Sequence, residues 1–168
     1  NIFHKDIEYF LDTKKINASE KARLQTLSIG VIMPSKFIEI ASKSEVLYTF
    51  APYSVYKEYG IHLDDMDMND LYDKLVENEN VIKKEVNPRK LLINIAKMQF
   101  ESGYPYIMFK DNANKNHALK NIGEIKMSNL CTEIFQLQET SIINDYGIED
   151  FIKRDISCNL GSLNIVNV

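Results

Sequence analysis

The segment from Asn87 to Gly103 constrains the fold most strongly. Asn87 can cap a helix, Pro88 suits the first helical position because it has no N–H to leave unpaired, and Gly103 suits the end. Between these signals the apolar residues recur at helical spacing, at Leu91, Leu92, Ile95, Met98 and Phe100. The segment therefore predicts one long helix that packs against a core.

Shorter segments on either side alternate between helix and strand patterns. Helical spacing and end signals predict helices over residues 6–15, 35–43, 52–60 and 67–79, with Ser35 as the cap of the second. Apolar, β-prone runs predict strands over 24–34, 104–109 and 156–168, whereas 111–123 predicts a polar loop or a frayed helix. Strands separated by helices are typical of an α/β fold with a parallel or mixed sheet.

Size and charge limit the classes of protein to which this chain can belong. A chain of 168 residues, 45% of them hydrophobic, is long enough to bury one sizeable core. Its formal charge of −4 argues against a general surface for nucleic acid or anionic membrane. No apolar run approaches the roughly 20 residues that cross a bilayer, and the first residues do not resemble a signal peptide. We therefore expect a cytoplasmic protein that binds neither membrane nor nucleic acid.

Both ends of the chain look interrupted. The first residues resemble the end of a strand, and the last ones, SLNIVNV, stop inside an apolar run that favours a strand. Strands need hydrogen-bonding partners, so we expect the sheet to continue into segments outside this chain. Residues 1–168 are accordingly predicted to form one internal fragment of a longer protein.

The residues that bind metals are few and scattered. Cys131 and Cys158 are too few for a disulfide framework, and the three histidines (His4, His62 and His117) lie far apart without a paired-cysteine motif. The acidic stretch 62–70 lacks the glycine and the glutamate that a calcium loop requires. We predict no bound metal and no catalytic histidine.

Cys131 lies midway between Asn129 and Glu133, within MSNLCTEIF. On a strand these three side chains would share one face. A buried face would place an amide and a carboxylate in the core at considerable cost unless they were paired. Spacing alone leaves two interpretations open: a surface strand with a small apolar cysteine, and a functional cluster.

Tyr104 and Tyr106, next to Pro105, are predicted to be packing residues.

Four stretches together resemble one enzyme family. MSNLCTEIFQLQETS and DISCNLGSLNIVNV follow ESGYPYIMFKDNAN, and FLDTKKINASEKARLQTLSIGV lies near the start. In order and spacing they are similar to the large catalytic (alpha) subunit of class I ribonucleotide reductase, most like class Ib, over essentially all 168 residues. The resemblance implies part of a ten-stranded α/β barrel with a central finger loop that carries the radical cysteine.

The resemblance also implies roles for four residues. Cys131 matches the thiyl-radical cysteine, Glu133 the general base, and Asn129 the amide that positions the substrate hydroxyls, so Asn129 and Glu133 would bind substrate. Cys158 matches one of two redox-active cysteines, whose partner would lie upstream of this chain. The implied reaction reduces ribonucleoside diphosphates to deoxyribonucleotides and leaves a disulfide.

Cofactors and partners follow from the same resemblance. This chain would bind no cofactor itself. A dimetal-tyrosyl small (beta) subunit would supply the radical, and a glutaredoxin- or thioredoxin-like dithiol would supply electrons. The full-length subunit would bind nucleotide effectors and form a homodimer. Because the second redox cysteine is absent, we expect the isolated chain not to turn over.

Two other interpretations remain open from the sequence. The chain could be a non-catalytic assembly piece of a split or intein-interrupted reductase. It could also be a thiol-redox protein that uses Cys131 and Cys158 directly, with a reversible disulfide and a thiolate of lowered pKa.

Overall fold

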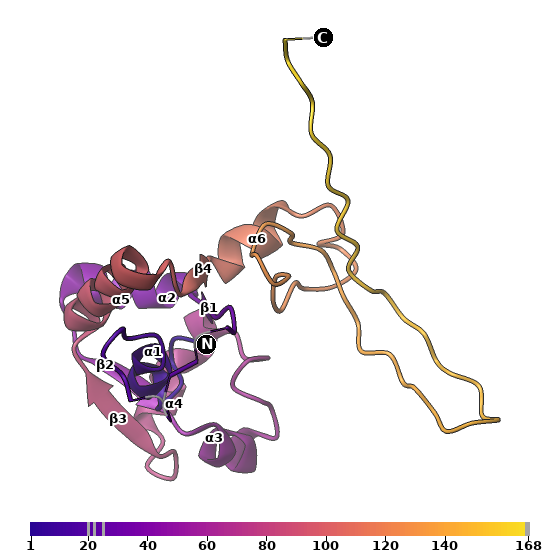
Figure 1. The fold of residues 1–168 in the computed structure, drawn as a ribbon. Coiled ribbons are helices and arrows are strands. Elements are labelled where there is room, and N and C mark those ends of the chain that lie inside the picture. The colour runs from indigo at the N-terminus through magenta and orange to yellow at the C-terminus, as the bar shows by residue number, and fades with distance from the viewer. Residues whose placement is uncertain (20, 22, 25, 167–168) are drawn as a thin grey trace.

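The fold consists of a packed α/β body followed by an extended segment. The computed structural model describes residues 1–19, 21, 23–24 and 26–166. Its helices are α1 (Ile7–Asp12), α2 (Ser35–Lys43), α3 (Pro52–Tyr59), α4 (Met68–Glu77), α5 (Pro88–Ser102) and α6 (Lys110–Asn116). Its strands are β1 (Gly30–Ile32), β2 (Leu47–Phe50), β3 (Lys83–Val86) and β4 (Tyr106–Met108). After α6 the chain first loops beside that helix, and its last part, yellow in Figure 1, extends away from the body.

The four strands form two small sheets. β1 pairs with β4 in parallel, with Gly30 opposite Tyr106, and β2 pairs with β3 in antiparallel fashion, with Leu47 opposite Val86. The predicted α/β class is confirmed, but the described strands form one parallel and one antiparallel pair instead of a single parallel or mixed sheet. The strands in the described part of the chain do not close into a barrel.

The core lies between these sheets and the helices α2, α4 and α5. Phe3, Phe37 and Phe50 are fully buried, and the ring centroid of Tyr72 lies 5.3 Å from that of Phe3. The Tyr72 hydroxyl also accepts a hydrogen bond from the Tyr48 N–H at 2.8 Å, and burial raises the pKa of Tyr72 to about 12. Within the described residues, no helix is long and apolar enough to span a bilayer.

The helix predictions based on local end signals are confirmed. In α5 the Asn87 side chain accepts a hydrogen bond from the Lys90 N–H, and Gly103 ends the helix with a φ of 77°. Gly60 ends α3 in the same left-handed conformation, and Pro52 opens it. One detail was wrong: Phe100 is 93% exposed, because it lies on the face of α5 opposite the core.

Other sequence predictions were wrong in ways that have a physical reason. β2 and β3 were not predicted, because strands this short depend on pairing rather than on pattern. Residues 156–166 form no strand, contrary to the prediction, since no neighbouring strand pairs with them. Residues 127–135 form none either, so the surface-strand interpretation of Cys131 was wrong. Residues 167–168, the end of the strand predicted over 156–168, lie outside the described part. The strand predicted over 24–34 is confined to β1, and residue 25 is likewise not described.

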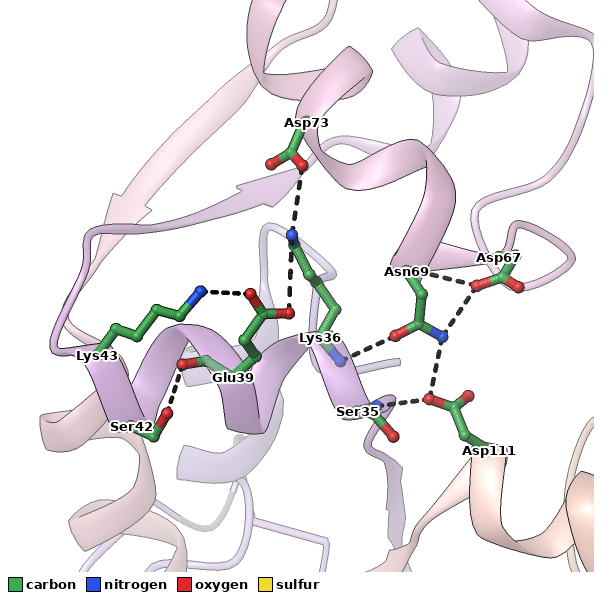
Figure 2. Close-up of polar contacts among 9 residues, drawn as sticks. All are labelled: Ser35, Lys36, Glu39, Ser42, Lys43, Asp67, Asn69, Asp73 and Asp111. Atoms are coloured by element: carbon green, nitrogen blue, oxygen red, sulfur yellow. Dashed lines mark hydrogen bonds and ion pairs between the residues drawn. The ribbon is translucent and has the colours of Figure 1, made fainter.

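The N-terminus of α2 is capped from elsewhere in the fold. Pro34, not Ser35, occupies the cap position, so the predicted Ser35 cap was wrong. The Asp111 carboxylate accepts hydrogen bonds from the Ser35 N–H at 2.7 Å and from the Asn69 side-chain amide at 3.1 Å. Figure 2 shows this cluster, in which the N-terminal ends of α2, α4 and α6 meet. The cluster holds these helices beside the ends of β1 and β4.

Candidate active site

Cys131 lies on an exposed turn. The Thr132 N–H donates a hydrogen bond to the Asn129 carbonyl oxygen at 3.2 Å, which closes the turn over residues 129–132. Thr132 has a φ of 63°, a left-handed conformation that is strained for a β-branched residue. The Ser128 and Thr132 hydroxyl oxygens lie 3.2 Å apart across the turn. The Cys131 thiol is free and exposed at its tip.

Asn129 links the turn to Glu133. Its side-chain oxygen accepts a hydrogen bond from the Ile134 N–H at 3.0 Å. Its amide also lies close enough to the Glu133 carboxylate to be the main cause of a lowered Glu133 pKa, because hydrogen bonds to a carboxylate favour its charged form. Glu133 is therefore an ionised, exposed carboxylate beside the cysteine turn.

Cys158 approaches the same carboxylate from the extended segment. Its Sγ donates to a Glu133 oxygen at a distance of 3.7 Å. Loss of water around the thiol raises the pKa of Cys158, and the nearby Glu133 carboxylate raises it further. The structure thus brings together all four residues that the sequence singled out.

A cavity of about 240 Å³ lies beside the turn. Residues 28–32, from β1 and the chain before it, line the cavity together with Tyr106 and Met108 of β4 and with residues 127–130 and Thr132. Asn129 therefore belongs both to the cysteine turn and to the wall of the cavity. The parallel pair β1 and β4 forms the part of that wall contributed by the body of the fold.

Tyr106 was missed as a residue of the site. It lines the cavity, and the charge of neighbouring Tyr104 raises its pKa, with smaller contributions from burial and from Cys131. Its ring does pack against Tyr104, with centroids 5.2 Å apart, so the packing prediction holds but was incomplete. The two-residue period of β4, which points Tyr106 and Met108 the same way, was the signal available in the sequence.

The histidines take no part in this cluster. His62 stacks on Tyr56 with centroids 4.5 Å apart, and His4 accepts a hydrogen bond from the Asp6 N–H. His117, at the end of α6, has a buried Nε2. Among the described residues, no group of three or more histidine, cysteine or acidic side chains is arranged to hold a metal ion.

Comparison with known proteins assigns the chain to a family. The family model described as the ribonucleotide reductase barrel domain matches residues 1–168. The chain belongs to this family. It is 58% identical over 168 residues to the ribonucleoside-diphosphate reductase subunit alpha of Bacillus subtilis. The aligned region covers 100% of this chain and 24% of the relative.

More distant relatives of this barrel-domain chain show the same partial coverage. Identity is 44% over 165 residues to the subunit alpha of Mycoplasma genitalium, covering 96% of this chain and 22% of the relative. Identity is 30% over 161 residues to the ribonucleoside-diphosphate reductase large chain of Neurospora crassa, and the aligned region covers 96% of this chain and 16% of that relative. The chain therefore spans about a quarter or less of the length of these relatives.

Proposed function

We propose that this chain is a catalytic-core part of a ribonucleoside-diphosphate reductase. The observation that carries the proposal is the convergence of Cys131, Asn129, Glu133 and Cys158 at one exposed turn beside a cavity. The names of the relatives, reductase subunits and large chains, agree with this chemistry.

In the proposed reaction Cys131 forms a thiyl radical that takes the hydrogen atom from C3′ of the substrate ribose. Sulfur suits this step because its S–H bond is weak enough to return the hydrogen at the end. Glu133 accepts the proton of the 3′ hydroxyl, which helps the neighbouring 2′ hydroxyl to leave as water.

Asn129 is proposed to orient the reacting groups. Its hydrogen bond to the Ile134 N–H fixes the amide, and its contact with Glu133 aligns the base. Holding the base and a substrate hydroxyl in fixed geometry lowers the barrier by removing the need to bring them together. The same amide also borders the cavity, where a sugar hydroxyl would lie.

Cys158 is proposed to supply electrons. Together with a second cysteine outside this chain it would lose two electrons and two protons and form a disulfide. Those electrons and protons reduce the 2′ carbon and complete the water that leaves. A dithiol of the glutaredoxin or thioredoxin kind then reduces the disulfide by exchange. The 3.7 Å contact between Cys158 and Glu133 supports a place for this thiol next to the base.

We further infer that residues 1–168 belong to one barrel domain. The parallel pair β1 and β4, joined through helices, supports a larger barrel of ten strands, and the exposed Cys131 turn supports a finger loop inside it. The whole protein is proposed to act in the cytoplasm as a homodimer with a radical-generating small subunit and nucleotide effectors. The word subunit in the relatives' names supports an assembly of more than one chain.

The test is deoxynucleotide formation from a ribonucleoside diphosphate. This chain is assembled with the flanking segments of the reductase, the radical-bearing small subunit and a dithiol. Cys131→Ser should lower the product to background, a loss of at least about a thousandfold, because a serine hydroxyl at this position has too strong an O–H bond to replace the thiol. The control Ser157→Ala, which alters an exposed side chain near Cys158, should retain activity. Equal activity of Cys131→Ser and wild type would reject the proposal.

Product that forms only when all segments are mixed is expected both of a catalytic-core part and of an assembly piece of a split reductase. The genomic sequence on either side of the coding region distinguishes these two interpretations. A stand-alone thiol-redox role is disfavoured by the raised pKa of Cys158, since such proteins need a reactive thiolate at neutral pH.

A further inference from the structure

The turn that carries Cys131 lies in a long segment without regular structure. Residues 117–136 form no helix or strand. A segment of this kind is mobile unless side chains tie it to the body of the fold. The position of the Cys131 thiol therefore depends on a few individual contacts.

One of these contacts, made through two hydrogen bonds, comes from Asn114 on α6. Its side-chain oxygen accepts a hydrogen bond from the Ile125 N–H at 2.7 Å, and its side-chain nitrogen donates to the Ile125 carbonyl oxygen at 3.0 Å. The same nitrogen lies 3.1 Å from the Lys110 carbonyl oxygen within α6. One amide thus pairs both backbone groups of Ile125, as a neighbouring strand would.

Further contacts close the loop around this point. The Ile125 side chain is fully buried, and Lys126 forms an ion pair with Asp65. At the base of the loop Gly123 packs against buried Leu137, so tightly that an added Cβ would lie 3.0 Å from a Leu137 methyl carbon. Residues 123–137 therefore form a closed loop, here called the cysteine loop, with the 129–132 turn at its tip.

We propose that Asn114 is a positioning residue for Cys131. By fixing Ile125 to α6, its amide sets where the cysteine loop leaves the body and hence where the thiol lies relative to the cavity. Asn114 acts through the backbone and does not touch the reacting atoms. The catalytic importance of the Cys131 position rests on the proposed function. The Asn114–Ile125 tether itself does not.

The experiment uses this chain with three substitutions. Asn114→Ala removes both hydrogen bonds, and Asn112→Ala alters an exposed asparagine of the same helix as a control. Asn114→Asp tests the geometry, because a protonated carboxyl group can accept from the Ile125 N–H and donate to its carbonyl, whereas a carboxylate repels that carbonyl. The first readout is the hydrogen-exchange protection of the Ile125 amide, corrected for intrinsic exchange at each pH.

The second readout is the position of Cys131. Nitroxide labels are placed on Cys131 and on Asp70→Cys, an exposed site of α4, in a Cys158→Ser background. Double electron–electron resonance gives the distribution of distances between them. Asn114→Ala should lower Ile125 protection about fivefold and widen the distance distribution about twofold. Asn112→Ala should change neither.

The conservative variant separates a tether from a general effect on stability. Asn114→Asp should resemble Asn114→Ala at neutral pH and regain protection at acidic pH, where its carboxyl group is protonated. Unchanged Ile125 protection in Asn114→Ala would overturn the tether. Lost protection with an unchanged distance distribution would overturn the positioning role. Neither readout needs turnover, so the outcome is independent of the test of the proposed function.

Discussion

The Asp111 carboxylate accepts a hydrogen bond of 2.7 Å from the backbone N–H of Ser35, 76 residues earlier in the chain (Figure 2). Ser35 opens α2, and Asp111 lies in the first turn of α6. The first turn of a helix has N–H groups without partners inside the helix, and here another helix supplies the acceptor. Because α2 follows β1 and α6 follows β4, this contact ties together the two strands beside the cavity.

Removal of this acceptor should destabilise the fold. Asp111→Ala removes the acceptor of the Ser35 N–H and one of the two acceptors of the Asn69 amide, which keeps its hydrogen bond to Asp67. We expect a loss of about 1–2 kcal/mol in the free energy of unfolding. Asp111→Asn retains an oxygen acceptor and should lose less. Urea unfolding of the three proteins measures the difference. Equal midpoints for Asp111→Ala and wild type would show that the contact contributes nothing.

The Asp111 contact should also make stability depend on pH. Burial tends to raise the pKa of Asp111, but the hydrogen bonds from Ser35 and Asn69 outweigh it and lower the pKa below its usual value. A lowered pKa in the folded state means that the stabilisation is present at neutral pH and is lost as the pH falls through the folded-state pKa. Unfolding measured from neutral to acidic pH should show this loss in wild type and a smaller loss in Asp111→Asn. Parallel curves would contradict the assignment.

Asn129 should control the protonation of Glu133. The Asn129 amide is the largest cause of the lowered Glu133 pKa, and the Cys158 thiol is a minor one. Asn129→Ala should therefore raise the pKa of Glu133 toward its ordinary value, whereas Cys158→Ala should raise it less. Carbon-detected NMR titration of the Glu133 carboxyl group measures both shifts. The reverse order of the two effects would show that the amide does not hold the carboxylate.

Glu133 in turn should affect the reactivity of Cys158. Loss of solvent raises the pKa of the Cys158 thiol, and the Glu133 charge adds to this effect. Glu133→Gln should lower that pKa and speed alkylation of Cys158 by iodoacetamide at mildly alkaline pH, because the thiolate is the nucleophile. Glu139→Gln, which removes a carboxylate paired with Arg154, is the matched control and should have little effect. Mass spectrometry resolves the rate at each cysteine.

The left-handed conformation of Thr132 should have a measurable cost. Asparagine tolerates this region better than a β-branched residue, but Thr132→Asn also loses the hydroxyl contact with Ser128, so we expect it to be more stable than Thr132→Val by roughly 0.5–1 kcal/mol. Thr132→Val keeps the strain and loses the hydroxyl contact with Ser128, so it should destabilise the chain by about 0.5–1 kcal/mol. Thermal and urea unfolding give both values. If Thr132→Asn and Thr132→Val change the free energy of unfolding equally, backbone strain at this turn is negligible.

The parts of the fold that could be predicted are those whose cause is local. Asn87, Pro88 and Gly103 act within one helix, and so do Pro52 and Gly60, which is why α5 and α3 appear where the sequence placed them. The pairing of β2 with β3 and the capping of α2 by Asp111 depend on residues far apart in the chain. No pattern within either segment contains that information.

The candidate site likewise combines features with a local cause and features that depend on residues far apart in the chain. Asn129, Cys131 and Glu133 are neighbours in sequence, so the sequence alone places them together, although they lie on a turn rather than on a strand. Their roles came from the family resemblance, not from the spacing. The approach of Cys158 to Glu133 and the place of Tyr106 in the cavity wall are tertiary contacts that only the structure provides.

The pairing of β1 with β4 has a consequence for how the protein is made. Contacts such as Ser28 with Tyr104 join residues that are 76 positions apart. During translation β1 leaves the ribosome long before β4, and the cysteine loop emerges later still. Early in synthesis the edge of β1 is therefore an unpaired strand edge that can associate with other chains. Chaperone binding to nascent chains should be strongest in this interval and should end once β4 has emerged.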